Sequence, residues 1–132
     1  MILRPADPTD ESIFFWIRNE PVALKASRRP VITEEEHHRW WTTTSDYLWV
    51  ATDDDGRILG TLRLSPDGIV SIIVSSQHRG QGMGPRMLLL LEHEAKELGF
   101  KRIWAEIAPE NVASQRAFLK AGWNPILLER GL

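Results

Sequence analysis

The chain has no cysteine among its 132 residues. This absence excludes disulfide frameworks, thiolate metal sites and a cysteine nucleophile. A long hydrophobic run is missing too, because the longest uncharged apolar stretch, residues 87–91, is far shorter than the roughly 20 residues that cross a bilayer. The N-terminus lacks the basic start and the apolar stretch of a signal peptide. We therefore expect a soluble, unprocessed, cytoplasmic protein that has no membrane partner.

An excess of positive charge is also missing, since 16 lysines and arginines stand against 18 aspartates and glutamates. Binding to nucleic acid through the release of counterions requires a basic surface, and so we expect no nucleic-acid partner. The length and the hydrophobic fraction of 42% fit a single domain over residues 1–132. Tryptophan is abundant: the six large amphipathic rings suit either a core or a binding cleft.

The pattern of apolar residues and turn signals predicts an α+β fold with a single mixed, mostly antiparallel sheet flanked by helices. Asp7, Thr33 and Asn111 are expected helix caps, and the Asp-Gly pairs at 55–56 and 67–68 favour hairpin turns. The expected strands are 1–4, 47–52, 57–64, 68–75, 101–107 and 124–129. One expected helix begins at Pro8, and the others span 34–44, 85–98 and 112–121. Residues 21–30 are expected to form a loop.

The turn after the fourth expected strand is rich in glycine and reads Arg79-Gly80-Gln81-Gly82-Met83-Gly84. Backbone amides of such a turn converge on one point, where the positive end of the following helix dipole adds to them. The position between a strand and a helix therefore predicts a pyrophosphate cradle, the alternative being a flexible connector with a capping glycine. The nucleoside-triphosphate loop and the dinucleotide fingerprint both fail, because Pro85 stands where the first needs lysine and the second needs a third glycine.

Two motifs resemble the cosubstrate-binding blocks of the GNAT family of N-acetyltransferases. One is Arg79-x-x-Gly82-x-Gly84, and the other is the run 111–123, which is close to the family's Asn-x-x-Ala/Ser run that ends in Gly-Phe. The order of elements resembles the acyl-CoA N-acyltransferase fold over nearly the whole chain. The resemblance implies that acetyl-CoA is the cosubstrate, and that it is bound by Ile72, Ile73, Val74, Arg79, Gly80, Gln81, Gly82, Met83, Gly84, Asn111, Ser114 and Phe118.

The resemblance also implies an enzyme that moves the acetyl group onto a primary amine. With no cysteine and no recognisable serine-histidine-acid set, direct attack by the amine is favoured over an acyl-enzyme. A backbone amide near Ile73 or Val74 is expected to stabilise the oxyanion. Glu106 is the first candidate for general base or water-linked relay, its alternative being an exposed carboxylate with a structural partner, and His78 is the second. Many relatives carry a tyrosine that protonates the thiolate at the position of Phe118.

The stretch 35–41 is expected to build the acceptor pocket, with His38 and Trp41 contacting the substrate together with Glu106. The alternative is a stripe that packs this helix onto the sheet. The pattern is similar to acetyltransferases of nucleotide-linked amino sugars, as in pseudaminic acid synthesis, and to those of ribosomal-protein N-termini. The other possibilities are an acetyltransferase of protein N-termini, antibiotics or small amines, and a non-catalytic acyl-CoA-binding module.

No metal site is expected. His37 and His38 point to different sides of a helix, and His93 has no second histidine four residues further on. Only ten residues follow Gly122, fewer than we expect for the closing hairpin of the fold, and so a neighbouring subunit is expected to complete the sheet edge in a homodimer.

Overall fold

In the computed structural model, which describes residues 1–27 and 30–124, the strands form one antiparallel sheet in the order β1-β2-β3-β4. Their bounds are β1 (Ile2–Pro5), β2 (Tyr47–Thr52), β3 (Ile58–Leu64) and β4 (Val70–Val74). Both predicted hairpin turns are confirmed, because Gly56 and Gly68 adopt φ angles of 81° and 88°, which side-chain-bearing residues rarely adopt. The predicted first four strands are therefore confirmed to within one or two residues.

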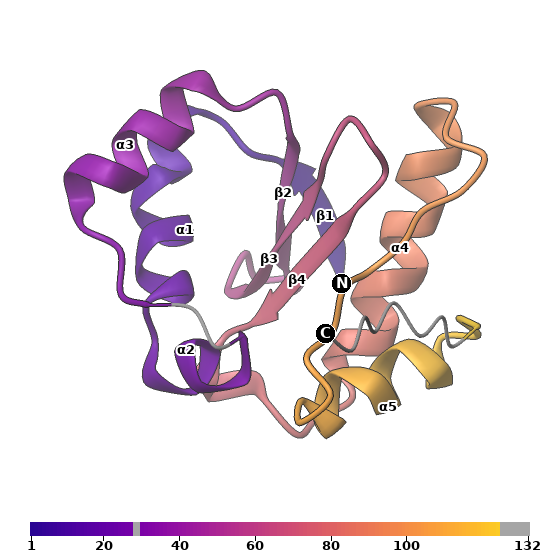
Figure 1. Ribbon diagram of the computed structural model, residues 1–132. Coiled ribbons are helices and arrows are strands. Elements are labelled where there is room, and N and C mark those ends of the chain that lie inside the picture. The colour runs from indigo at the N-terminus through magenta and orange to yellow at the C-terminus, as the bar shows by residue number, and fades with distance from the viewer. Residues whose placement is uncertain (28–29, 125–132) are drawn as a thin grey trace, which may run out of the picture.

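The helices lie on both faces of the sheet (Figure 1). On one side are α1 (Glu11–Arg18), α2 (Pro21–Ser27) and α3 (Glu34–Thr43), and on the other are α4 (Met83–Glu97) and α5 (Val112–Lys120). Single 3-10 turns precede α1 at Pro8–Asp10 and follow β4 at Ser76–His78. In the described part of the chain, no helix is long and apolar enough to span a membrane.

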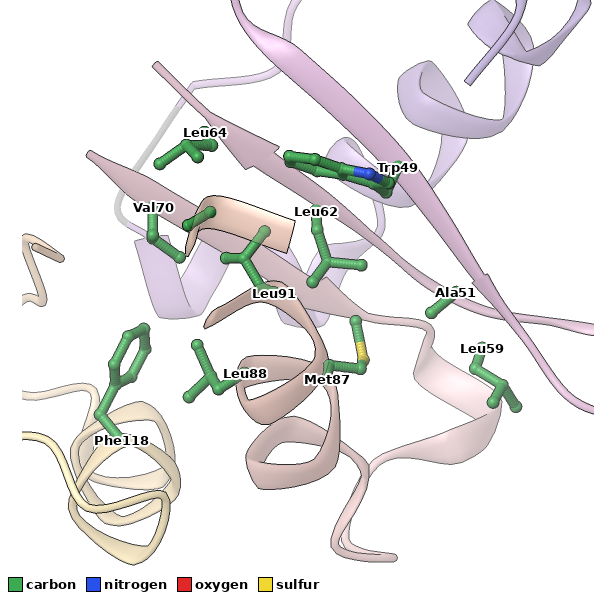
Figure 2. Close-up of a cluster of buried hydrophobic side chains, with 11 residues drawn as sticks. Trp49, Ala51, Leu59, Leu62, Leu64, Val70, Met87, Leu88, Leu91 and Phe118 are labelled. Carbon is green, nitrogen blue, oxygen red and sulfur yellow. The ribbon is translucent and has the colours of Figure 1, made fainter. Parts of the chain in front are cut away.

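The main core fills the space between the sheet and α4 with α5 (Figure 2). Alternate side chains of β3 point to opposite faces, so Leu62 and Leu64 enter this core while Thr61 and Arg63 face α1 and α3. The largest side chains that are less than 2% exposed are Leu62, Leu64, Met87, Leu88 and Leu91 of this core, and Val50 outside it. This packing fixes the position of β4 and of the two helices that flank its open edge.

Three sequence predictions differ from the structure. Residues 21–27 form α2 where a loop was expected, because Pro21 has a φ angle suited to a first helical position and seven residues are too few to show a period. Helix α4 begins at Met83, two residues before the expected Pro85, since a proline is tolerated anywhere in the first turn.

The third difference is at 101–107, where a strand was expected. Among the described residues only Trp104 pairs there, in a parallel bridge with Ile69. Beyond this bridge the segment leaves β4, and so the alternating pattern has no strand to pair with. The mixed, mostly antiparallel character of the pairing is confirmed, and the last predicted strand at 124–129 lies outside the described residues apart from Asn124.

Asp10 joins β1 to the start of α1. Its carboxylate accepts hydrogen bonds from Nη1 and Nη2 of Arg4 at 2.7 and 2.9 Å, and from the backbone N–H of Asp7 at 2.9 Å. Only 3% of Asp10 is exposed. The hydrogen bonds from Arg4, which outweigh the effect of burial, hold the pKa of Asp10 below its ordinary value.

We expect the substitution Asp10→Asn to lower the free energy of unfolding by about 1–3 kcal/mol at neutral pH, because it weakens charge-assisted hydrogen bonds. Since the folded-state pKa of Asp10 is depressed, the contribution is present above the ordinary carboxyl pKa of 3.8 and is lost as the pH falls through the lower folded value. Urea unfolding of both proteins across this range measures the difference.

Asp54→Asn is the matched control, since the Asp54 side chain is 94% exposed, and we expect it to change stability by less than about 0.5 kcal/mol. A deficit of the Asp10→Asn protein that stays constant in acid would show that the stabilisation does not come from the ionised pair.

Candidate active site

The outer edge of β4 is open beyond its bridge to Trp104. The backbone N–H of Val70 donates to the carbonyl of Trp104 at 2.7 Å, whereas the N–H of Ser75 donates to Leu59 on β3 at 2.8 Å. Because N–H and C=O groups alternate in direction along an antiparallel strand, those of Ile72 and Val74 point outward, away from β3. The amide of Ile73 points toward β3, so of the two candidate oxyanion donors only the Val74 amide faces the open edge.

A cavity of about 140 Å³ lies where the segment 105–108 separates from β4. Seven of the residues predicted for the site line it: Ile72, Ile73, Arg79, Glu106, Asn111, Ser114 and Phe118. Val74 and residues 80–84 are not among its lining. The structure therefore gathers the β4 edge, one end of the glycine-rich turn and α5 around a single space.

The glycines of the turn are required for different reasons. Gly80 and Gly82 have φ angles of 77° and 75°, and a Cβ on either would meet no heavy atom within 4 Å. Gly82 is the N-cap of α4, so backbone amides at the helix start are not covered by a side chain there. Gly84 lies inside α4, where a Cβ would come within 3.2 Å of Cβ of Ala117, and so it allows α5 to pack closely on α4.

Arg79, at the start of this turn, and Asn111, just before α5, both line the first cavity. Nε of Arg79 is buried and has no hydrogen-bond partner among the described residues. A buried cationic group of this kind fits an anionic ligand, which would supply the missing acceptor. Oδ1 of Asn111 accepts a hydrogen bond from the backbone N–H of Ser114 at 3.2 Å and caps α5, as the sequence predicted.

A second cavity, of about 240 Å³, lies between the sheet and the helices α1 and α3. It shares the lining residues Arg18, Ser71 and Ile73 with the first cavity, so the two adjoin at β4. The remaining lining residues are Phe14, Ile32, His37, Trp40, Thr61, Leu62 and Arg63. Of these residues, His37 and Trp40 belong to the stretch 35–41 that was expected to build the acceptor pocket.

Of the predicted acceptor residues, His38 and Trp41 do not line this cavity, and Glu106 lines the first cavity. His38 is exposed, with Nδ1 2.8 Å from Oε1 of Glu11. The ring of Trp41 packs against Phe14 at a centroid distance of 5.3 Å, which attaches α3 to α1. The residues of α3 that face the cavity are instead His37 and Trp40, and their i, i+3 spacing is the signal that identifies a common helix face.

His37 is the most buried titratable group of the second cavity, at 2% exposure. Burial lowers its pKa, and the attraction of Glu11, whose Oε1 lies 3.9 Å from Nδ1, opposes that effect. The imidazole is therefore neutral near neutral pH. It packs against the rings of Phe15, Trp40 and Trp41.

The candidate bases differ in position. Glu106 is exposed and lines the first cavity. Nδ1 of His78 is 2.7 Å from Oγ of Ser75, and His78 lines neither cavity. Phe118, which stands where many GNAT relatives have tyrosine, is 6% exposed and meets Trp123 edge-on at 4.7 Å.

Comparison with known proteins adds to this geometry. Residues 11–123 match the profile of the family described as "Acetyltransferase (GNAT) family". A segment of 59 residues is 34% identical to the uncharacterized N-acetyltransferase YobR of Bacillus subtilis (strain 168), and it covers 45% of this chain and 24% of that protein. The chain thus spans about a quarter of the length of this curated relative.

Two solved structures have the same fold. A domain from Methanocaldococcus jannaschii DSM 2661 superposes with a TM-score of 0.85 at 21% identity, covering 98% of this chain and 91% of that one. The spermidine N-acetyltransferase of Vibrio cholerae, in complex with CoA and spermine, superposes with a TM-score of 0.77 at 16% identity, covering 92% and 79%. With a family profile that matches most of its length, this chain belongs to the acetyltransferase (GNAT) family.

Proposed function

We propose that this chain is an acetyl-CoA-dependent N-acetyltransferase that acts on a primary amine of a small molecule. The observation that carries this proposal is the pair of cavities that adjoin at Arg18, Ser71 and Ile73, one at the open edge of β4 and the other under α1 and α3. Two substrates that enter from opposite sides would meet at this junction. Direct transfer between them requires alignment more than covalent machinery.

The first cavity fits the cosubstrate. The amides at the start of α4 and the buried Nε of Arg79 would hold the diphosphate, and the outward N–H and C=O groups of Ile72 and Val74 would pair with the pantetheine arm beside Asn111 and Ser114. The V. cholerae relative was solved with CoA. Acetyl-CoA supplies an acetyl thioester, in which a thiolate is already a good leaving group.

The reaction balances without a cofactor. The amine nitrogen forms a bond to the carbonyl carbon, the carbon–sulfur bond breaks, and the sulfur gains the proton that the amine loses. The Val74 amide would donate to the carbonyl oxygen as negative charge develops there. Before the attack, Glu106 would accept the first proton of the ammonium form, directly or through water, because an alkylammonium with a pKa of about 10.4 is mostly protonated at neutral pH. The proton that passes to the sulfur is the one that the nitrogen loses after it has attacked the carbonyl carbon.

For the acceptor we propose a nucleotide-linked amino sugar, on the sequence pattern described above. The second cavity, at about 240 Å³, is below the roughly 300–1,000 Å³ of most ligand pockets, so the amine-bearing end of such a molecule would enter it and the remainder would stay outside. Spermine in the V. cholerae relative makes a polyamine the main rival acceptor, and a protein N-terminus or an antibiotic is the other.

A non-catalytic acyl-CoA-binding module is the second candidate function. It is favoured by one observation, the apolar Phe118 at the position of the phenol that protonates the thiolate in many relatives. Release of free thiol from acetyl-CoA in the presence of an amine panel separates the two. Turnover with any acceptor supports the enzyme, whereas CoA binding with no turnover on the whole panel supports the module.

The substitution Glu106→Gln is expected to lower kcat by roughly 100-fold or more while CoA affinity stays nearly unchanged, because it removes the proton acceptor and keeps the side-chain shape. Thiol release at saturating substrates measures kcat, and calorimetry measures CoA binding. Glu97→Gln, at the exposed end of α4, is the control and should leave both unchanged. An unaltered rate for Glu106→Gln would remove Glu106 from the mechanism.

The substitution Gly82→Ala is expected to weaken CoA binding by at least about tenfold, because a methyl group enters the space in front of the turn amides and the left-handed backbone is strained. Gly99→Ala is the matched control, since Gly99 also has a positive φ, of 92°, and open space around it, but lies after the far end of α4. Both variants should lose similar stability, about 1 kcal/mol. Equal CoA affinity in the two proteins would contradict the cradle.

A further inference from the structure

We infer that the acceptor carries a carboxylate or a phosphate near its amine, and that Arg18 and Arg63 recognise this anionic group in the second cavity. The inference rests on the proposed function and specifies its substrate class. It concerns the charge of the cavity, which no sequence motif of the family describes.

The lining of the second cavity carries positive charge from two elements. Arg18 comes from the end of α1 and Arg63 from β3, and no aspartate or glutamate is among the described residues that line the space. Two described carboxylates lie behind the lining: Asp46 pairs with Arg63, and Glu11 faces His37 and His38. The described lining therefore presents two guanidinium groups and no carboxylate.

Both guanidinium groups are held in place. Nη1 of Arg18 donates to the carbonyl of Pro30 at 3.2 Å, while Nε of Arg63 is 3.4 Å from Oδ2 of Asp46. The guanidinium carbon of Arg63 also lies 5.4 Å from the ring centroid of Trp40. Because these contacts fix the groups before any ligand arrives, an anion that enters loses little free energy to side-chain ordering.

His37 shows that this positive charge acts inside the cavity. Burial is the main reason for its low pKa, and repulsion from Arg18 lowers the pKa further against the attraction of Glu11. A neutral imidazole adds no charge to the two guanidinium groups of the lining. The same repulsion acts on any ammonium group of a ligand, so a polycation such as spermine is disfavoured.

The rest of the lining suits the remainder of such an acceptor. Phe14 and Trp40 offer aromatic surface to a flat or apolar part. Thr61 and Ser71 lie on the same face of β3 and β4 as Arg63 and offer hydroxyl groups. Ser71 and Arg18 are also at the junction with the first cavity, which puts the proposed anion site within reach of an amine located there.

The test uses pairs of amines that differ only in the anionic group. L-phenylalanine is compared with phenethylamine, D-glucosamine 6-phosphate with D-glucosamine, and spermidine serves as the polycation. In at least one pair, the anionic member should have a kcat/KM at least about tenfold higher than its partner without the anionic group and than spermidine. The pair that responds distinguishes carboxylate from phosphate. Equal or better use of the members without the anionic group, or of spermidine, overturns the inference.

Calorimetric titration of the same five amines into the CoA-saturated protein decides the question where turnover is too slow to measure. The anionic members should bind more tightly, and absence of any such difference overturns the inference. Failure of the proposed function is a separate result, because it appears as CoA binding without turnover of any amine or as an absence of CoA binding. In that case the titrations into the unliganded protein still decide the charge preference.

Variants at the Arg63–Asp46 pair test the residue assignment. Arg63→Met should abolish most of the preference for the anionic amine and leave CoA affinity unchanged, while Arg63→Lys should retain part of it. Asp46→Asn removes the compensating carboxylate and should keep or raise the preference, so it remains informative if Arg63→Met does not fold. A preference that Arg63→Met leaves intact, or that Asp46→Asn abolishes, overturns the assignment.

Discussion

The site depends on one place where two chain segments meet and then separate. Trp104 makes two backbone hydrogen bonds at the start of β4: the N–H of Val70 donates to its carbonyl at 2.7 Å, and its own N–H donates to the carbonyl of Gly68, just before β4, at 2.8 Å. The segment then leaves the sheet. A continuous parallel pairing would satisfy the outward groups of Ile72 and Val74 and close the first cavity. In the proposed function, these outward groups, with which no described strand pairs, would give an extended ligand a place to bind.

Packing on both faces of the sheet holds β4 and the segment after Trp104 apart. The core under β4 contains Leu88 of α4 and Phe118 of α5, and the two helices approach closely because Gly84 lacks a side chain against Ala117. On the other face, the aromatic contacts of α1 with α3 hold the walls of the second cavity. A site placed between such rigid layers can align two substrates, which is the main requirement of a direct acyl transfer.

Much of the fold was predictable because its signals are local. Asp-Gly turns, the Thr33 cap and the Asn111 cap each depend on a few neighbouring residues, and the structure confirms them. The helix at 21–27 and the interruption after Trp104 were not predictable in this way. The first is too short to show a period, and the second depends on where a distant strand lies.

In the site, too, the features that depend on neighbouring residues were predictable and those that depend on distant residues were not. The glycine turn and the 111–123 run are contiguous motifs, so the sequence identified the residues around the first cavity. The second cavity combines Arg18, His37 and Arg63 from three separate elements. Their side chains meet only because α1 and α3 pack over the face of β3 that carries Thr61 and Arg63, and no local pattern encodes that packing.

The charge of the second cavity also bears on how the amine loses its proton. Two fixed guanidinium groups destabilise an ammonium ion beside them and so favour the neutral amine that attacks the thioester. In the proposed mechanism, a base at Glu106 would then have less work to do. The same two arginines would select an anionic acceptor and favour the neutral form of its amine, in a site whose described lining holds neither a buried carboxylate nor a tyrosine at position 118.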